Sequence, residues 1–246
     1  IELNETIYAL NRIGAVVVSL NVRFSPNELI YVVDHADIST LAFQDQFEET
    51  IRKIITSVHG VKTLLCSGKA VPDEFIDFEA KTSEQSSQMP EVDVKENDIA
   101  SIMYTSGTTG KPKGVKRALA DIDPDTSAEL FTFLLGLFGI TAKGGNVHLS
   151  TSPNYHTAAT TFAGNSLHMG HTVVCMDKWD AEETLRLIER YKCTHTHMVP
   201  TQFIRMLQLP DDVKAKYDVS AMKYAIHAAA PCPVDTKRRM LEWWGP

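Results

Sequence analysis

The sequence predicts an α/β protein built from parallel β-sheets flanked by helices. Two observations support this fold class. Short apolar runs rich in β-branched residues recur along the 246 residues, and segments with a helical period separate most of them. Strands joined by a helix normally pair in parallel, because the crossover returns the chain to the same end of the sheet. Ligands of such sheets bind at the carboxyl ends of the strands, so the loops at those ends are the candidate sites.

The amino-terminal half of the chain carries a clear helix start. Ser25 and Glu28 stand three residues apart with Pro26 between them, which is the pattern of a capping box with proline in the first turn. The helix that begins there should reach about His35. The other elements predicted for this half are a helix at 4–13, strands at 15–20, 39–43, 62–67 and 98–104, and a helix at 48–60 that ends on Gly60.

The segment 68–97 differs from its surroundings. It is rich in Glu, Asp, Ser, Gln and Pro and has no sustained periodicity, so we expect a surface excursion. A second irregular stretch at 120–127 precedes the carboxyl-terminal half, where strands and helices alternate and Asp180 is the expected cap of one helix. The helices predicted there lie at 128–140, 158–168, 181–192, 201–207 and 234–244, and the strands at 146–150, 171–176, 194–199 and 223–229.

Composition and charge exclude some classes of function. With 43% hydrophobic and 22% charged residues, the chain has the composition of a globular protein with a substantial core. The formal net charge of −7, together with the lack of a basic run longer than KRR at 237–239, argues against a nucleic-acid-binding surface. The most apolar stretch, 128–140, is too short to span a bilayer and should form a buried helix, although peripheral membrane contact stays open.

The cysteines indicate a compartment. They lie far apart and form no CxxC pair, so we interpret them as free thiols in a reducing environment and expect a cytoplasmic protein. Nothing in the sequence indicates the oligomeric state. The cysteines are Cys66, Cys175, Cys193 and Cys232.

The most informative stretch is YTSGTTGKPKGV at 104–115, which follows an apolar run. Its glycines allow close approach of the backbone to an anion, while its hydroxyls and lysines supply hydrogen-bond donors and positive charge, so we expect it to hold a polyphosphate. It is not the P-loop GxxxxGK[ST], because only two residues separate Gly107 from Gly110 and Pro112 follows Lys111. The residues assigned to nucleotide binding here are Thr105, Ser106, Gly107, Thr108, Thr109, Gly110, Lys111 and Lys113.

The same stretch resembles the phosphate-binding signature of the adenylate-forming, or AMP-binding, superfamily. This superfamily includes acyl-CoA synthetases, luciferases and the adenylation domains of peptide synthetases. Segments at 10–37, 152–159 and 198–246 resemble the family in the same order and spacing, so the likeness covers nearly the whole chain. The last two segments are more similar to fatty-acyl-CoA synthetases than to amino-acid-activating domains.

The resemblance implies a two-step reaction. A carboxylic acid, here a fatty or other hydrophobic one, attacks the α-phosphorus of ATP with magnesium as the metal, giving an acyl-adenylate and pyrophosphate, and coenzyme A then displaces AMP. The resemblance also implies that residues 1–246 are part of the large amino-terminal domain, without its extreme amino terminus, its end and the small carboxyl-terminal domain. We therefore expect the isolated chain to be inactive.

Two further sites follow from the resemblance. His156, in the loop SPNYHTAA, resembles the family's histidine beside the path of the carboxylate and the thiol, which makes it the candidate catalytic residue. Ala229, Ala230 and Pro231 stand where the purine of the nucleotide lies in the family. The family commonly has glycine at one or two of these positions, so the adenine geometry stays open. Taken alone, a loop histidine is more often a surface residue, and alanines at a strand end are more often core.

No metal site is expected within the chain. Cys193, His195 and His197 alternate along a predicted strand and would project to one face. Neighbouring positions on such a face are about 6 to 7 Å apart, which is too far for the ligands of one tetrahedral ion. His197 is instead a candidate for lining an acyl tunnel.

Three alternative functions stay open at this stage. The chain could belong to an adenylation domain that loads a carrier protein, or to an oxygenase like luciferase. It could also belong to a nucleotide-binding relative that has lost catalysis and serves as a sensor or scaffold.

Overall fold

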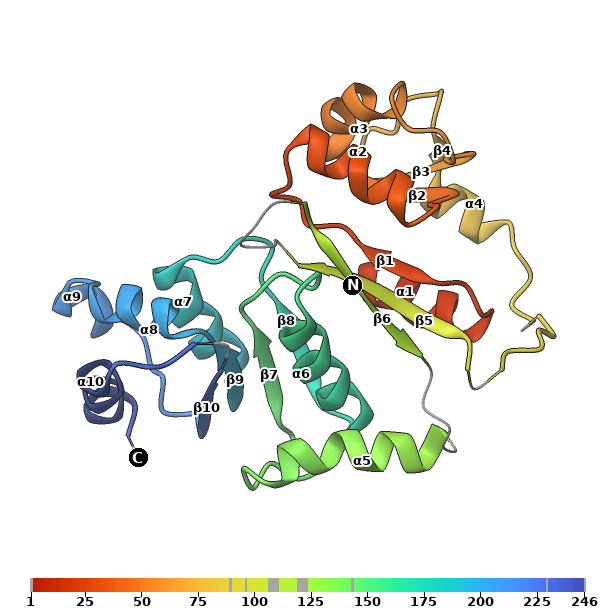
Figure 1. The fold of residues 1–246 in the computed structure, drawn as a ribbon. Helices are drawn as coiled ribbons and strands as arrows, with labels where there is room; N and C mark the ends of the chain where they lie inside the picture. Colours follow the sequence, from red (N-terminus) through yellow and green to blue (C-terminus); the bar gives the residue numbers. More distant parts are fainter. Residues whose placement is uncertain are drawn as a thin grey trace. The chain divides into compact units, whose positions relative to one another are not determined.

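The computed structural model of the chain describes residues 2–88, 90–95, 97–105, 111–118, 124–142, 144–228 and 230–245. Contacts within the chain divide it into two compact units. We call residues 5–121 the amino unit and residues 122–246, with 1–4, the carboxyl unit. Each unit contains parallel strands flanked by helices, as the sequence predicts (Figure 1). The first helix is α1 (Glu2–Arg12), which starts two residues before the predicted one.

The amino unit has an apolar core between two helices and a small parallel sheet with the strand order β2-β3-β4. Val32 and Ile54, one from each helix, are fully buried in one cluster, and Phe43 and Leu64 of the sheet pack against that cluster. The elements of this region are α2 (Pro26–His35), β2 (Thr40–Gln44), the 3-10 helix η1 (Asp45–Phe47), α3 (Glu48–Ile55), β3 (Thr63–Ser67), β4 (Ile76–Asp77) and α4 (Phe78–Ser83).

Helix starts in the amino unit follow from side-chain caps. The predicted capping box of α2 is confirmed, since the Glu28 N–H donates to Ser25 Oγ at 3.4 Å and the Ser25 N–H donates to the Glu28 carboxylate at 2.7 Å. The segment 68–97, predicted as irregular, contains β4 and α4. Asp77 caps α4 by accepting a hydrogen bond from the Ala80 N–H at 2.8 Å. This cap is a local sequence signal for a helix, but the polar composition of the segment led to the prediction of irregular structure.

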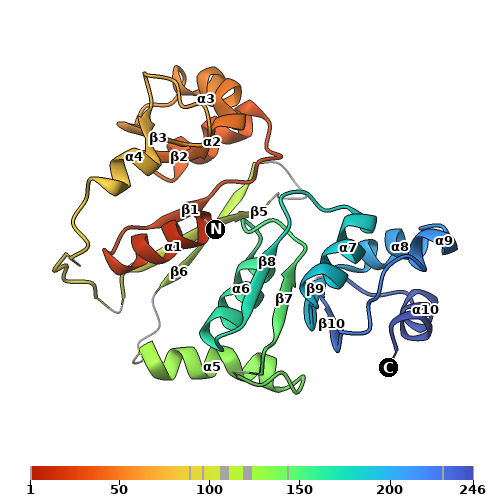
Figure 2. The same ribbon diagram turned by 180° about the vertical axis from the view of Figure 1, so that it is seen from behind.

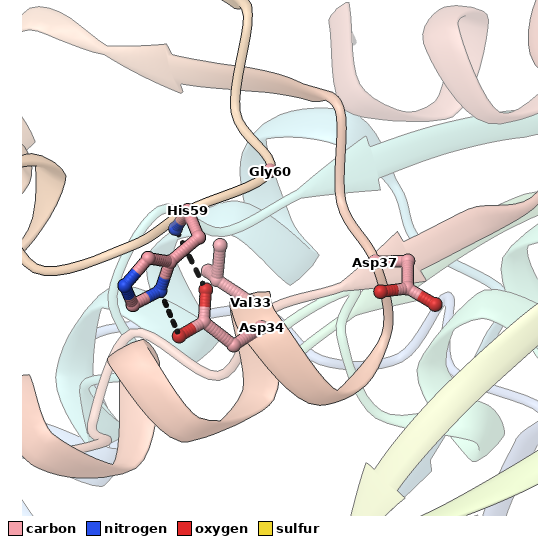
Figure 3. A pocket seen from close by; sticks show the side chains of 5 residues that line it. All are labelled: Val33, Asp34, Asp37, His59 and Gly60. Atoms are coloured by element: carbon pink, nitrogen blue, oxygen red, sulfur yellow. Dashed lines mark hydrogen bonds and ion pairs between the residues drawn. The ribbon is translucent and has the colours of Figure 1, made fainter.

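The end of α3 differs from the prediction. The helix ends at Ile55 and does not reach Gly60. Past its end, the backbone N–H of His59 donates to Asp34 Oδ1 of α2 at 3.0 Å, and His59 Nδ1 lies 3.2 Å from Asp34 Oδ2. This stretch is therefore tied to α2 and does not prolong α3. The two residues line a concavity of about 290 Å³, and Figure 3 shows both contacts between them.

A second sheet of the amino unit frames the glycine-rich loop. Its strands are β1 (Val17–Ser19), β5 (Ile99–Thr105) and β6 (Lys113–Ala118), in the order β1-β5-β6. The β1–β5 pair is parallel and the β5–β6 pair is antiparallel. The strand β6 was not predicted. Gly114 of β6 pairs with Tyr104 of β5. A Cβ at this position would lie only 3.1 Å from the Tyr104 ring, so the absence of a side chain at Gly114 allows the close approach.

The carboxyl unit is a four-stranded sheet in the order β10-β9-β7-β8, with all neighbours parallel. Helix α6 packs on β7 and β8, as the front and back views of Figures 1 and 2 agree. The predicted cap of α7 is confirmed, because Asp180 accepts from the Glu183 N–H at 2.9 Å. The elements are β7 (Val147–Ser150), α6 (Thr157–His168), β8 (Thr172–Cys175), α7 (Ala181–Tyr191), β9 (His195–Met198), α8 (Pro200–Leu207), α9 (Asp211–Lys214), β10 (Tyr224–His227) and α10 (Val234–Trp244).

The apolar helix predicted at 128–140 corresponds to α5 (Pro124–Gly136), which is only partly buried. Leu135 is fully buried in a cluster with Phe162 of α6, whereas Leu130 and Phe133 are 59% and 64% exposed. The expectation of a buried helix is therefore wrong for one side of α5, because α6 covers the other side only. Among the described helices, none combines the length and the apolarity that crossing a bilayer requires.

Candidate functional site

The loop between β5 and β6 lies only partly within the described residues. Its central positions Ser106, Gly107, Thr108, Thr109 and Gly110 lie outside them. Thr105, Lys111 and Lys113 are described, and Thr105 and Lys113 are partners in the β5–β6 register. The antiparallel pair therefore fixes where the chain enters and leaves the loop. We call Thr105 and residues 111–113 the loop stem.

The loop stem presents donors and positive charge to solvent. Thr105, Lys111 and Lys113 are exposed, while Pro112 between the lysines is buried. The residues from 105 to 118 include four lysines and arginines and no acidic residue. An anion with several negative charges would find hydrogen-bond donors and cations here without a repelling carboxylate nearby in the sequence.

Three aromatic residues adjoin the loop stem. The ring of Tyr31 on α2 lies under Lys111, with the ammonium 4.8 Å from the ring centroid. One turn further along α2, His35 Nδ1 lies 2.6 Å from the hydroxyl of Tyr104, the residue before Thr105. Burial, followed by the nearby charges of Tyr31 and Asp37, raises the pKa of Tyr104, so its hydroxyl stays protonated at neutral pH. This cluster was not predicted from the sequence, although the spacing of Tyr31 and His35 places both on one side of α2.

His156 lies at the beginning of α6, beyond the carboxyl end of β7. It is the N-cap residue, with φ −89° and ψ 131°, and its carbonyl accepts from the Thr160 N–H at 3.2 Å. The imidazole is exposed, and its ring centroid lies 4.5 Å from that of Tyr155. An exposed imidazole at a helix N-terminus, where the dipole favours negative charge, can meet an anionic reactant.

The predicted adenine segment follows β10 in the same sheet. Ala230 and Pro231 are exposed, and Ala229 lies outside the described residues. The strands β10, β9 and β7 are parallel, so the segment after β10 and the loop that carries His156 leave the sheet at the same edge. The structure thus brings these two predicted sites to one edge of the carboxyl unit.

Four imidazoles are buried in the carboxyl unit, three on strands β7 and β9 and one, His171, directly before β8. The rings of His148 and His171 each contact the ring of His195, with centroids 4.8 and 5.2 Å apart, and His195 Nε2 lies 3.0 Å from Ser166 Oγ. His197 stacks on Phe162 at 4.5 Å with an interplanar angle of 13°. Among the described residues, no group of three or more His, Cys, Asp or Glu side chains is arranged to hold a metal ion. All four histidines are buried, and the acyl-tunnel role of His197 stays a prediction.

Comparisons with known proteins agree with this fold. A family model described as AMP-binding enzyme matches residues 1–246. The 4-hydroxybutyrate–CoA ligase 2 of Metallosphaera sedula is 25% identical over 244 residues, which cover 96% of this chain and 43% of that protein. The long-chain-fatty-acid–CoA ligase of Bacillus subtilis is 27% identical in an alignment 253 residues long, which covers 92% of this chain and 44% of that protein. The chain thus spans less than half the length of these relatives.

Solved structures of known proteins share the fold of this chain. The anthranilate CoA ligase AuaEII, crystallised with anthranoyl-AMP, superposes with a TM-score of 0.85 at 20% identity, over 98% of this chain and 45% of that one. At this identity the likeness concerns the fold alone. ATP-bound MatB from Rhodopseudomonas palustris superposes with a TM-score of 0.78 at 26% identity, again over 98% and 45%.

Proposed function

Because the chain belongs to the AMP-binding enzyme family, we propose that its protein activates a carboxylic acid with ATP and transfers the acyl group to coenzyme A. The observation that carries this proposal is the loop stem, which exposes Thr105, Lys111 and Lys113 on a β-hairpin within a chain that the family matches from end to end. In the first step, the carboxylate displaces pyrophosphate from the α-phosphorus of ATP. In the second step, the thiol of coenzyme A displaces AMP and a thioester forms.

The phosphate side of the reaction is assigned to the loop. Negative charge grows on the departing pyrophosphate, and fixed hydroxyl and ammonium donors stabilise it without rearranging. Lys111 and Lys113 carry the charge, and Thr105 donates through its hydroxyl. Ser106, Gly107, Thr108, Thr109 and Gly110 remain predicted phosphate contacts.

Magnesium is the metal that the family implies. Mg²⁺ prefers carboxylate, carbonyl, water and phosphate oxygens. The stretch 105–118 contains no carboxylate, and the loop stem offers a hydroxyl and ammonium groups. These residues do not fit a protein-held magnesium ion, so we assign no metal ligand to this stretch.

The carboxylic acid substrate and the adenine of ATP are assigned to the carboxyl unit. His156 would stand beside the carboxylate, where its exposed ring and the N-terminus of α6 both favour an anion. Ala229, Ala230 and Pro231 would lie against the purine, because small side chains let a flat ring approach the backbone. We propose a fatty or other hydrophobic acid as the substrate, supported by the relative named for long-chain fatty acids. Free cysteines support a cytoplasmic location.

The proposal is tested by acid-dependent pyrophosphate release in the full-length protein. Straight-chain acids of increasing length are compared with a short hydroxy acid and an aromatic acid, with and without coenzyme A. We expect turnover with at least one hydrophobic acid and a coenzyme A thioester as the product. Release of pyrophosphate without any thioester would instead favour a carrier-protein acceptor. A protein that binds ATP and releases no pyrophosphate with any acid would favour a scaffold that has lost catalysis.

A second measurement tests the division of labour along the chain. We propose that residues 1–246 alone do not form the acyl-adenylate, since the chain spans less than half the length of its relatives. The isolated chain is assayed under the same conditions as the full-length protein. Robust acid-dependent pyrophosphate release by the isolated chain would contradict this part of the proposal.

A further inference from the structure

We propose that Tyr31 and His35 of α2 are positioning residues for the nucleotide's phosphates. Tyr31 contacts Lys111 after the glycine-rich loop, which we also call the phosphate loop, and His35 contacts Tyr104 before it. The inference rests on the proposed function and extends it to residues outside the glycine-rich loop. Its basis is a set of contacts among described residues that come from α2, the end of β5 and the loop stem.

The first contact restrains Lys111. A lysine ammonium on a four-carbon stem samples many rotamers in solution and gains little from a single surface partner. Here the ammonium lies 4.8 Å from the centroid of the half-buried Tyr31 ring, a distance typical of a cation–π contact. The contact keeps the positive charge beside the loop without neutralising it, which a carboxylate partner would do. The charge therefore stays available to a phosphate.

The second contact restrains the other end of the loop. Tyr104 precedes Thr105 and holds His35 Nδ1 at 2.6 Å through its hydroxyl. The rings of His35 and Tyr104 meet edge to face, with centroids 5.9 Å apart. Tyr104 also lies beside its register partner Gly114 of β6, where a Cβ would come within 3.1 Å of the ring. Tyr104 thus joins α2, β5 and β6 at the entrance of the loop.

The two contacts are parts of one cluster. Tyr31 and His35 are one helical turn apart, and their rings lie 5.2 Å apart at the centroids. Holding donors in place before a ligand arrives lowers the entropy lost on binding. The cluster should therefore favour ATP affinity, and among the described residues its contacts lie at the loop stem and not at the residues assigned to the acid.

The test measures KM for ATP and KM for the acid in variants of the full-length protein. In Tyr31→Leu, which removes the ring, we expect KM for ATP to rise about two- to fivefold. In His35→Leu, which removes the hydrogen-bond partner of Tyr104, we expect a rise of about two- to tenfold. KM for the acid and the thermal midpoint should change little in both.

Conservative variants separate positioning from folding. Tyr31→Phe keeps the ring and His35→Asn keeps a polar nitrogen near the place of Nδ1, so both should restore most of the ATP affinity. Tyr191→Leu is the matched control, because Arg190 lies 5.3 Å from the centroid of the exposed Tyr191 ring in the carboxyl unit, far along the chain from the loop. It should leave KM for ATP unchanged.

Two outcomes overturn different statements. If Lys111→Ala raises KM for ATP while Tyr31→Leu and His35→Leu leave it unchanged, the positioning role is wrong and the phosphate loop stands. If Lys111→Ala also leaves KM for ATP unchanged, the role assigned to the loop is wrong and the positioning role fails with it. If the leucine variants do not fold, Tyr31→Phe and His35→Asn decide: each should keep most of the ATP affinity, and a large rise of KM for ATP in either would overturn the positioning role.

Discussion

The loop stem of the amino unit and the sheet of the carboxyl unit both contain several basic side chains, but they differ in exposure. Lys111 and Lys113 lie open to solvent, whereas His148 and His195 are 1% and 0% exposed. Lysine keeps its charge in water, while a buried imidazole avoids the cost of a buried charge by staying neutral. Basic side chains are therefore packed in the core in one region, and exposed in the other, where we propose that they bind a ligand.

The titration of the buried rings supports this contrast. Burial, and to a smaller extent the neighbouring His171, lowers the pKa of His195 to about 4. Burial also lowers the pKa of His148 well below its usual range, with additional repulsion from the three other histidines. Changes in the two regions should thus act on different observables, stability in the sheet and nucleotide affinity in the stem.

The largest expected effect comes from the core of the carboxyl unit. Leu149 of β7 is fully buried with Ile188 of α7 and Cys193. Replacing it in Leu149→Ala should lower the free energy of unfolding by about 2–5 kcal/mol, because a cavity is left in the core. Urea denaturation measures the change. The matched control Leu241→Ala, on the exposed side of α10, should cost far less, and equal costs would contradict the packing described here.

In the loop stem, the expected effect is on binding. Lys113→Ala should weaken ATP binding by about 1.5–3 kcal/mol, the range for hydrogen bonds to charged groups, while the urea midpoint stays near that of the unchanged protein. Calorimetric titration with ATP measures the affinity. Lys116→Ala, a change of the same kind further along β6, should have a smaller effect. Unchanged ATP affinity in Lys113→Ala would remove this lysine from its assigned role.

The buried histidines predict a pH dependence of stability. An unfolded histidine titrates near pH 6.5, whereas His195 in the folded chain does so near pH 4. Between these values the unfolded state binds more protons, so stability present above pH 6.5 is lost as the pH falls, by about 1.4 kcal/mol per pH unit for one histidine. Urea midpoints at several pH values measure the slope. His195→Gln should make the slope shallower, and an equally steep slope in this variant would exclude His195 as its source.

The smallest expected effect concerns the helix cap. Asp180→Ala removes the side chain that accepts from the Glu183 N–H at the start of α7. The free energy of unfolding should fall by about 1 kcal/mol, with ATP affinity unchanged. Asp177→Ala, an exposed aspartate three residues earlier, is the control and should change the urea midpoint less.

Local signals predicted much of the fold from the sequence. Ser25 and Glu28 gave the start of α2, and Asp180 gave the start of α7, because a cap depends on residues a few positions apart. The strand β6 was missed because all its residues are exposed, so no alternation of apolar and polar residues marks it. The short α4 and α9 were missed because one turn carries too little periodicity.

Only part of the candidate site could be predicted from the sequence. The loop between β5 and β6 is a continuous stretch and could be identified from its composition. The contact of His35 with Tyr104 joins residues 69 positions apart, and no local pattern reports such a pairing. The division into two compact units was also not predicted, and the assignment of residues 1–246 to one large domain stays a prediction.

The strand β6 has a consequence for association between molecules. In the described part of the chain β6 is an edge strand of the sheet β1-β5-β6, so one row of its backbone N–H and C=O groups lacks a neighbouring strand in that sheet. Open rows of this kind recruit strands from other chains and start aggregates. This edge carries positive charges at Lys113, Lys116 and Arg117, so two copies of the chain that approach through their β6 edges would repel each other.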